Sequence, residues 1–392
     1  NMYNYKLLTP GPLTTTSTVK EEMLFDRCTW DQDYKNITQK IRSQLLELAA
    51  ASEEEYTVVL MQGSGTFAVE SVMTTAISTN DKALIITNGA YGERVVQMAQ
   101  YIGLNFREYS VAYNEYPNDA ELSSILKEDQ EITHIVMVHC ETTTGILNPI
   151  DMIAKLSKEY GKTLIIDAMS SFGGIEIDIP GLEIDYLISS ANKCIQGVPG
   201  FGFVIAKLDK LKACEGNARS LSLDLFDQWK EMDKEGKWRY TSPTHVVAAF
   251  SKAIDELVDE GGISARFARY QSNNHLLRER LGKIGIHPYI SAEKQSPIIT
   301  TFLFPNNHFS FDDFYSFVKV RGYVIYPGKL TDVDTFRIGN IGEIITIKDL
   351  KSASPMDSFS EHKAARHATD IIATVKQNGI ECGKITISEK YV

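Results

Sequence analysis

Short strand-like runs alternate with helical stretches between about Thr57 and Lys207, and this alternation constrains the fold more than any other feature of the sequence. The runs are TVVLMQ, KALIITNG, THIVMVHCE, TLIIDAMSS, YLISSAN and FGFVIAK. Apolar strands that alternate with helices are typical of a mostly parallel sheet covered by helices on both faces, so the sequence predicts an α/β fold. Between the first two runs, SGTFAVESVMTTAI has apolar residues at helical spacing and predicts an amphipathic helix packed on the sheet.

The pattern changes beyond about Phe250, where long helical stretches carry only a few strands, notably PIITTFLF and TFRIGNI. A chain of 392 residues also exceeds one ordinary hydrophobic core. We therefore expect a large domain over residues 16–249 and a smaller α+β domain formed by residues 1–15 and 250–392.

The charge and the cysteine pattern exclude several classes of function. A formal net charge of −11 argues against a nucleic-acid-binding protein, because affinity for phosphate backbones depends on clustered Lys and Arg. No apolar run approaches the ~20 residues of a membrane span, and NMYNYKLLTPGPL lacks the apolar region of a signal peptide. The five cysteines form no CxxC pair or zinc-type cluster, so we expect reduced thiols, no metal and a cytoplasmic location.

The stretch MQGSGTFAVE leads from a strand into the predicted helix through Ser64, Gly65 and Thr66. A helix N-terminus offers unpaired N–H groups and a partial positive charge, and glycines let a phosphate approach the backbone. The stretch is a candidate phosphate site, with an ordinary helix cap as the alternative. Because it matches neither GxGxxG nor the Walker A pattern, dinucleotide and nucleoside triphosphate binding lose support.

Two ionisable residues follow later strands of the same predicted sheet. Asp167 ends an apolar strand, and Lys193 lies between YLISSAN and a loop rich in glycine. Ligands bind at the carboxyl edge of parallel sheets, although a turn cap at Asp167 and a solvated strand end at Lys193 are the ordinary interpretations. With the phosphate site, the pair fits pyridoxal 5′-phosphate (PLP). Lys193 would form the Schiff base, Asp167 would keep the pyridine nitrogen protonated, and the Ser64–Thr66 amides would hold the phosphate.

The chain also resembles a known family, the class V aminotransferases of PLP fold type I. The matching stretches cover about Leu7 to Gly342 and are LLTPGPLTT, RCTWDQDY, GSGTFAVE, NGAYGER, HCETTTGILNP, DAMSSFGG, SSANKCIQGVPGFGFV, RYTSPTH and FRIGNIG. The resemblance implies a large domain with a mostly parallel sheet and a smaller α+β C-terminal domain. It also implies that Lys193 and Asp167 are catalytic and that Ser64, Gly65 and Thr66 cradle the cofactor phosphate.

Further roles are implied by the resemblance alone. Tyr91 resembles the aromatic residue that stacks on the cofactor ring, and Thr142 the hydroxyl residue near its phenolic oxygen. Thr241 resembles a residue lent to the phosphate by the other subunit, which implies a homodimer with shared active sites. Arg337 resembles the arginine that grips the substrate carboxylate, and Trp30 is a weaker candidate for shaping the substrate pocket, together with Lys329 and Thr331.

Within the family, the motifs are most similar to those of members that act on 2-aminoethylphosphonate and pyruvate. The expected reaction gives phosphonoacetaldehyde and L-alanine. Alternatives are an alanine– or serine–glyoxylate aminotransferase, a PLP lyase, a desulfurase, which would need an exposed reactive cysteine on a mobile loop, and a binding module without catalysis. Cys194, beside Lys193, is considered as a nucleophile, but no nearby His is evident to activate it. The segment KSASPMDSFSEHKAARHATDII, after Gly342, departs from the closing helix that the family would lead us to expect.

Overall fold

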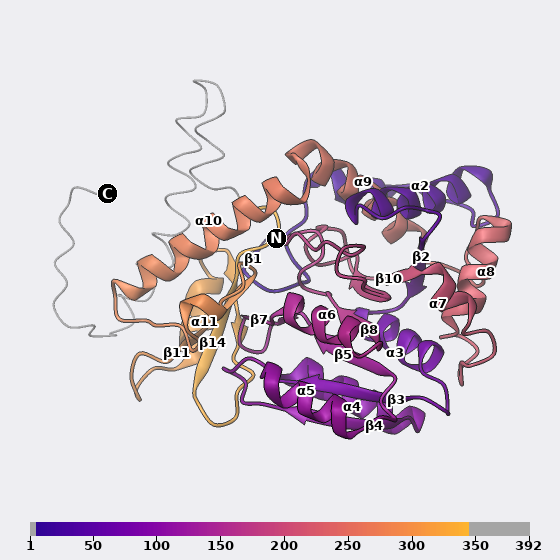
Figure 1. Ribbon diagram of the computed structural model, residues 1–392. Coiled ribbons are helices and arrows are strands. Elements are labelled where there is room, and N and C mark those ends of the chain that lie inside the picture. The colour runs from indigo at the N-terminus through magenta and orange to yellow at the C-terminus, as the bar shows by residue number, and fades with distance from the viewer. Residues whose placement is uncertain (1–4, 345–392) are drawn as a thin grey trace.

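The computed structural model describes residues 5–344; residues 1–4 and 345–392, including the unusual segment after Gly342, lie outside the described part. A sheet of seven strands forms the centre, in the order β2-β10-β9-β8-β5-β3-β4 (Figure 1). Only β10 runs antiparallel to its neighbours, which confirms the mostly parallel sheet. The strands are β2 (Tyr56–Gln62), β3 (Lys82–Thr87), β4 (Asn105–Ser110), β5 (His134–Val138), β8 (Thr163–Asp167), β9 (Tyr186–Ser190) and β10 (Phe201–Lys207).

Helices cover this sheet, and its central strands are buried along their whole length. The predicted amphipathic helix is confirmed as α3 (Gly65–Ala76), which buries Ala68, Val72 and Met73. The other helices of this part are α1 (Ser17–Glu21), η1 (Glu22–Leu24), α2 (Gln32–Leu48), α4 (Ala90–Ile102), α5 (Asp119–Glu128), α6 (Ile150–Glu159), α7 (Leu208–Lys212), α8 (Leu225–Glu235) and α9 (Thr244–Glu260).

A smaller sheet lies beside the large one and is built around stacked phenylalanines such as Phe302 and Phe336. Its strand order is β11-β14-β13. The N-terminal segment contacts this part, because β1 pairs in parallel with β12. The elements are β1 (Lys6–Leu7), α10 (Gly262–Gly282), η2 (Ala292–Lys294), β11 (Ile299–Leu303), α11 (Phe311–Lys319), β12 (Tyr323–Val324), β13 (Tyr326–Pro327) and β14 (Thr335–Gly339). A small two-stranded ribbon, β6 (Cys140–Glu141) and β7 (Ile146–Leu147), lies between β5 and β8 in the chain.

The long helix α10 connects the two parts. Near its start Arg266 contacts the loop after β9, and near its end Leu281 packs in the core of the small sheet. The preceding helix α9 packs against α2 and contributes Val247 and Leu257 to the core of the large sheet. The division of the domains at residue 249 therefore stays a prediction. Among the described residues, no helix is both long and apolar enough to span a membrane.

The sheet topology brings five loops to one edge. The parallel strands β2, β3, β5, β8 and β9 all end there, and β10 begins there. The turn after β2 requires a glycine, because Gly63 has φ = +109°, a conformation that residues with a Cβ rarely adopt. The carboxyl edge of the sheet is therefore where the structure concentrates polar loops.

Candidate active site

A cavity of about 330 Å³ opens at this edge of the sheet. The predicted residues that line it share a position just after a strand or at a helix start; they are Ser64, Gly65, Thr66, Tyr91, Thr142, Asp167 and Lys193. Arg337, Trp30 and Thr241 do not line it in the described chain. The sequence motifs thus converge on one site, although they come from five separate loops.

The Lys193 side chain enters the cavity from the loop after β9. Its Nζ donates hydrogen bonds to the backbone oxygens of Pro10 and Gly11, at 3.1 and 3.2 Å. Burial lowers the pKa of Lys193, while the neighbouring Tyr91 and Asp167 partly oppose this shift. A lysine with a lowered pKa holds a larger share of neutral, nucleophilic amine at neutral pH.

Gly11 explains part of the LLTPGPLTT motif, for which sequence reasoning gave no role. A Cβ at Gly11 would lie 2.6 Å from Lys193 Cδ, and its φ of +111° also favours glycine. The N-terminal segment therefore passes directly over the lysine. The signal available in the sequence was the Pro-Gly-Pro run, which indicates a tight turn but does not say what the turn contacts.

Asp167 ends β8 with its carboxylate at the cavity. Burial raises the pKa of Asp167 to about 6, although the hydrogen bond from Met169 N–H and the charges of Lys193 and Arg94 act in the other direction. The Met169 N–H donates to Oδ1 at 2.9 Å. A buried carboxylate is costly unless a cation meets it, so this position suits a ligand that brings a protonated nitrogen.

The N-terminus of α3 has the features of an anion site. Ser64 is the N-cap, yet its side chain accepts no capping hydrogen bond, and the first turn of the helix has no acidic residue. Gly65 packs against Met169, since a Cβ there would lie 2.3 Å from Met169 Sδ. Unused N–H groups, a hydroxyl and the helix dipole together suit a phosphate.

Arg94 is a site residue that sequence reasoning missed. It lines the cavity, its Nη1 lies 3.5 Å from Thr66 Oγ1, and its guanidinium lies 5.0 Å from the centroid of the Tyr91 ring. The signal was its position in NGAYGER, three residues after Tyr91 and hence on the same helix face. Arg94 adds a full positive charge beside the phosphate cradle.

Tyr91 is fixed at the start of α4 by a buried carboxylate, Glu141. The Glu141 side chain accepts hydrogen bonds from the N–H groups of Tyr91 and Gly92 at 3.1 and 3.2 Å. At the other end of the side chain, Lys329 Nζ lies 3.1 Å from the hydroxyl oxygen. Burial raises the pKa of Tyr91, but the hydrogen bonds from Thr142 and Lys329 and the charges of Lys329 and Lys193 outweigh it and lower the pKa to about 8.

Arg337 comes from β14 of the small sheet and contacts the loop that carries Thr142. Its Nε donates to the Pro327 oxygen at 2.9 Å and its Nη1 to the Thr142 oxygen at 3.1 Å. The side chain is only 3% exposed. The small sheet therefore places a rigid guanidinium directly against the Thr142 loop.

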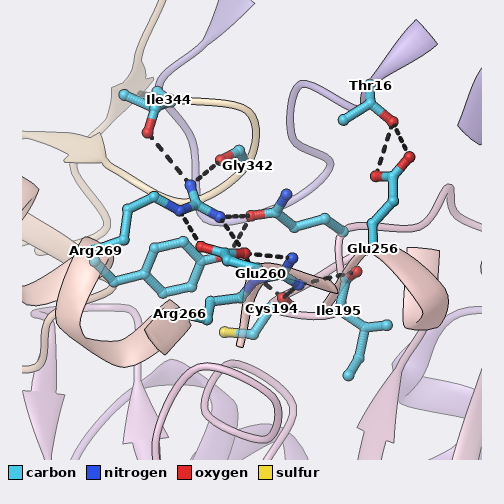
Figure 2. A network of polar contacts seen from close by, with 11 residues as sticks. Thr16, Cys194, Ile195, Glu256, Glu260, Arg266, Arg269, Gly342 and Ile344 are labelled. Carbon is cyan, nitrogen blue, oxygen red and sulfur yellow. Dashed lines mark hydrogen bonds and ion pairs between the residues drawn. The ribbon is translucent and has the colours of Figure 1, made fainter. Parts of the chain in front are cut away.

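A network of ion pairs holds the loop that carries the lysine (Figure 2). Arg266 donates to the backbone oxygen of Cys194 at 2.8 Å and forms an ion pair with Glu260 at 2.8 Å. Glu260 also binds Arg269, which reaches the Gly342 oxygen at 2.7 Å. The network ties the residue after the lysine to α9, to α10 and to the segment that follows β14.

Cys194, weighed in the sequence as a possible nucleophile, is a buried free thiol. Burial raises its pKa to about 12, so the reactive thiolate is absent at neutral pH. His139, in the neighbouring strand region, is buried with Nδ1 at 2.8 Å from Ser171 Oγ, and burial lowers its pKa to about 4. Both side chains are therefore buried in surroundings that suit a structural role.

Trp30 and Thr241 lie together at a second, surface cavity of about 400 Å³. Trp30 is 72% exposed, and the ammonium of Lys35 lies 4.6 Å from the centroid of its ring. Thr241 lies just before α9, whose first turn begins at Thr244. Within one chain, neither side chain reaches the cavity that holds Lys193.

The residues at the first cavity fit PLP. The α3 N-terminus and Arg94 suit a phosphate, the acid Asp167 suits a ring nitrogen, and Lys193 suits an aldehyde. Fold and site together define a PLP-dependent enzyme of fold type I.

Comparison with known proteins identifies the family. The model of the family "Aminotransferase class-V" matches residues 27–331, and the chain belongs to this family, whose cofactor is PLP. A 2-aminoethylphosphonate–pyruvate transaminase of Lysinibacillus sphaericus (strain C3-41) is 65% identical over 343 residues, 88% of this chain and 94% of the relative. Another, of Bacillus thuringiensis (strain Al Hakam), is 59% identical over 342 residues, 87% of this chain and 94% of the relative. The resemblance seen in the motifs is confirmed.

Solved structures confirm the predicted fold. An alanine–glyoxylate aminotransferase of Nostoc sp. superimposes with a TM-score of 0.81 at 24% identity, over 88% of this chain and 91% of that one. A pyridoxamine–pyruvate aminotransferase of Mesorhizobium loti also gives a TM-score of 0.81, at 21% identity, over 96% of this chain and 98% of that one. At this level of identity the similarity concerns the fold.

Proposed function

We propose that this aminotransferase moves the amino group of 2-aminoethylphosphonate to pyruvate, giving phosphonoacetaldehyde and L-alanine. The observation that carries the substrate is the 65% identity to a 2-aminoethylphosphonate–pyruvate transaminase over 94% of that relative's length. The site is compatible with it, because Arg94, Lys329 and Arg337 gather cations around Tyr91 in a chain of net charge −11. Anionic substrates need such a local concentration of positive charge.

Each residue of the site has a role in this proposal. When bound, PLP supplies an aldehyde that captures amines covalently and a ring that withdraws electrons from the bond being broken. Lys193 Nζ takes a proton from the carbon that carries the donor's amino group, and in the second half-reaction it delivers a proton to C2 of the pyruvate skeleton. Asp167 holds a proton against the ring nitrogen, and Tyr91 stacks on the ring.

The remaining residues bind and orient. Ser64, Gly65 and Thr66 hold the phosphate through the α3 N-terminus, with Arg94 as its positive partner. Thr142 lines the same cavity and would hold the phenolic oxygen of bound PLP with its hydroxyl. Arg337 holds the acid group of either substrate with its planar fork, which fixes the reacting carbon relative to Lys193.

We propose further that two copies of the chain share their sites. Thr241 and Trp30 line one surface cavity and lie outside the Lys193 cavity of their own chain. A second copy that brings Thr241 to the cofactor phosphate also brings Trp30, because both lie on the same surface. The exposed Leu24, Phe25 and Tyr240 support an interface on this side, since apolar side chains this exposed are unfavourable in water.

We also propose that the protein is located in the cytoplasm. The described residues contain four free cysteines, three of them buried, and reduced thiols are typical of the cytoplasm.

The substrate is tested by single half-reactions. The holoenzyme with 2-aminoethylphosphonate alone should release one equivalent of phosphonoacetaldehyde per site, and later addition of pyruvate should give one equivalent of L-alanine. β-Alanine and ethanolamine are matched controls, because each keeps the two-carbon amine and replaces the phosphonate by a carboxylate or a hydroxyl. Both should react far more slowly, since a site built to pair the phosphonate charge is left unsatisfied. Faster turnover of L-alanine or L-serine with glyoxylate would instead support the alternative aminotransferase.

A further inference from the structure

Two cations from the small-sheet region lie near Tyr91. Lys329 Nζ lies 3.1 Å from the hydroxyl oxygen and 4.3 Å from the ring centroid. Arg337 is a second cation near Tyr91, and the charge interaction between them acts on the pKa of Arg337. The hydroxyl of Tyr91, which lines the cavity, is thus the acceptor of the Lys329 ammonium, and the Arg337 guanidinium lies near the same residue.

Neither cation forms an ion pair with a carboxylate within residues 5–344. The other partners of Arg337 are the backbone oxygens of Pro327 and Thr142, which fix its orientation but bring no negative charge. A buried cation without a counter-ion is costly, and Arg337 is almost completely buried. The arrangement therefore favours an anion that arrives with the substrate.

The two cations suit different parts of an acid group. The planar fork of Arg337 matches two coplanar oxygens, which a carboxylate and a phosphonate both provide. Lys329 is half-buried on a loop, and its ammonium is a point charge on a flexible stem. Like a phosphate monoester, a phosphonate adds a third oxygen and a charge above one near neutral pH. Only the phosphonate therefore has an oxygen and a negative charge left for a second cation to bind.

We propose that Lys329 determines specificity for the phosphonate by binding its third oxygen and second negative charge, and that this oxygen replaces the Tyr91 hydroxyl as the partner of the ammonium. Arg337 alone then serves the carboxylate of pyruvate and alanine. This inference rests on the proposed function and names the residue through which one pocket accepts two different acid groups.

The competing explanation is that Lys329 only stabilises the loop or orients Tyr91. A structural role would weaken all ligands to a similar degree, because it acts through the shape of the whole cavity. A charge-specific role weakens only ligands that carry the second charge. The distinction needs ligands that share the two-carbon chain and differ in the charge of the acid group, and a readout that does not depend on turnover.

Three unreactive ligands provide this comparison. Above its second pKa, the pH range used for the comparison, ethylphosphonate is a dianion; its monomethyl ester keeps the tetrahedral phosphorus with one charge less, and propionate carries a carboxylate. Binding of each to the holoenzyme is measured by calorimetry for wild type, Lys329→Met and Lys329→Arg. Lys283→Met controls for the loss of one positive charge. Lys283 is an exposed lysine just after the end of α10 that forms an ion pair with Glu279. Melting temperature and cofactor content are checked for every variant.

We expect Lys329→Met to weaken ethylphosphonate by roughly 10- to 100-fold, which is the range of a lost charge-assisted hydrogen bond. The monoester and propionate should change by less than about 3-fold, Lys329→Arg should retain part of the preference, and Lys283→Met should behave as wild type. Equal weakening of all three ligands, or no weakening of ethylphosphonate, would overturn the inference.

The kinetic counterpart separates this inference from the proposed function. Lys329→Met should lower kcat/KM for 2-aminoethylphosphonate far more than for L-alanine in the reverse half-reaction. If wild type does not use 2-aminoethylphosphonate at all, the proposed function fails. If wild type uses it and Lys329→Met keeps the wild-type ratio of the two substrates, only the role of Lys329 fails.

Discussion

Arg266 Nη1 donates a hydrogen bond to the backbone oxygen of Cys194, the residue directly after Lys193, at a distance of 2.8 Å. Arg266 is 2% exposed, and its charge is balanced by Glu260 at 2.8 Å. The loop that carries Lys193 is therefore supported by a guanidinium on the helix that connects the two sheets. The position of Lys193 Nζ depends on residues far from the cavity.

Replacement of Arg266 should harm both stability and catalysis. Arg266→Met leaves Glu260 with one partner fewer and frees the Cys194 carbonyl, and breaking a buried ion pair in this way costs about 3–5 kcal/mol. We expect a lower melting temperature and, at temperatures where the variant is folded, a loss of kcat larger than the change in KM. Arg266→Lys keeps the charge but has only one donor group. Its melting temperature and kcat should lie between those of wild type and Arg266→Met. If kcat of the folded variant equals that of wild type, the loop does not need this support.

The sequence predicted the individual elements of the site better than their connections. Asp167, Lys193 and Ser64 were visible because each directly follows an apolar strand, and parallel strands bring such positions to one edge. Arg94, Glu141 and Arg266 were not visible, since their partners lie far away in the chain and no local pattern reports a long-range hydrogen bond. For the same reason, the closeness of Gly11 to Lys193 could not be foreseen from the turn it forms. The strand pattern predicted the fold because hydrophobic periodicity is a local property.

Lys193→Ala should abolish turnover while the protein still binds PLP through the phosphate cradle. The amine is needed both to capture the cofactor and to move the proton, and no other lysine lines the cavity in the described chain. Borohydride treatment of wild type followed by peptide mass spectrometry should place the pyridoxyl group on Lys193, and the variant should carry none there. Appreciable transamination by the variant without added amine would remove Lys193 from its role.

Gly65→Ala should reduce cofactor affinity more than stability. The new Cβ would lie 2.3 Å from Met169 Sδ and would displace the flexible end of that side chain. Because Met169 lines the cavity, the displaced end would take up space that the cofactor needs. We expect the dissociation constant of PLP, measured by fluorescence titration of the cofactor-free protein, to rise by roughly 10-fold or more. The double variant Gly65→Ala/Met169→Ala should recover most of the affinity, because the obstructing side chain is gone. No recovery would mean that the glycine matters for another reason.

Thr241 allows a test of site sharing by subunit mixing. Thr241→Ala should bind PLP more weakly than wild type if the hydroxyl reaches the phosphate of the other copy. Mixed dimers of Lys193→Ala and Thr241→Ala chains should regain activity, because both lesions fall in one composite site and the other site is intact. The regained activity should approach half that of a wild-type dimer. Mixtures as inactive as the Lys193→Ala protein, despite proven exchange of subunits, would show that each chain completes its own site.

Asp167 makes the stability of the cofactor-free protein depend on pH in a predictable direction. Burial raises the pKa of Asp167 to about 6, whereas an aspartate in the unfolded chain has a pKa of about 3.9. As the pH rises from 4 to above 6, the unfolded chain releases this proton more readily than the folded one, so stability falls over that window. A difference of about 2 pKa units corresponds to about 3 kcal/mol of lost stability once both states are ionised.

Asp167→Asn should remove this penalty, because the amide cannot ionise but can still accept the hydrogen bond from the Met169 N–H. The cofactor-free variant should therefore unfold at a higher temperature than wild type at pH 7.5, and the difference should vanish near pH 4. Asp259→Asn, on the exposed side of α9, controls for the loss of one surface carboxylate. With PLP bound, Asp167→Asn should be much less active than wild type, since only the carboxylate holds a proton on the ring nitrogen. Preorganised electrostatics of this kind supply several kcal/mol. If the unfolding temperatures of wild type and Asp167→Asn change with pH in the same way between pH 4 and 8, burial does not raise the pKa of Asp167.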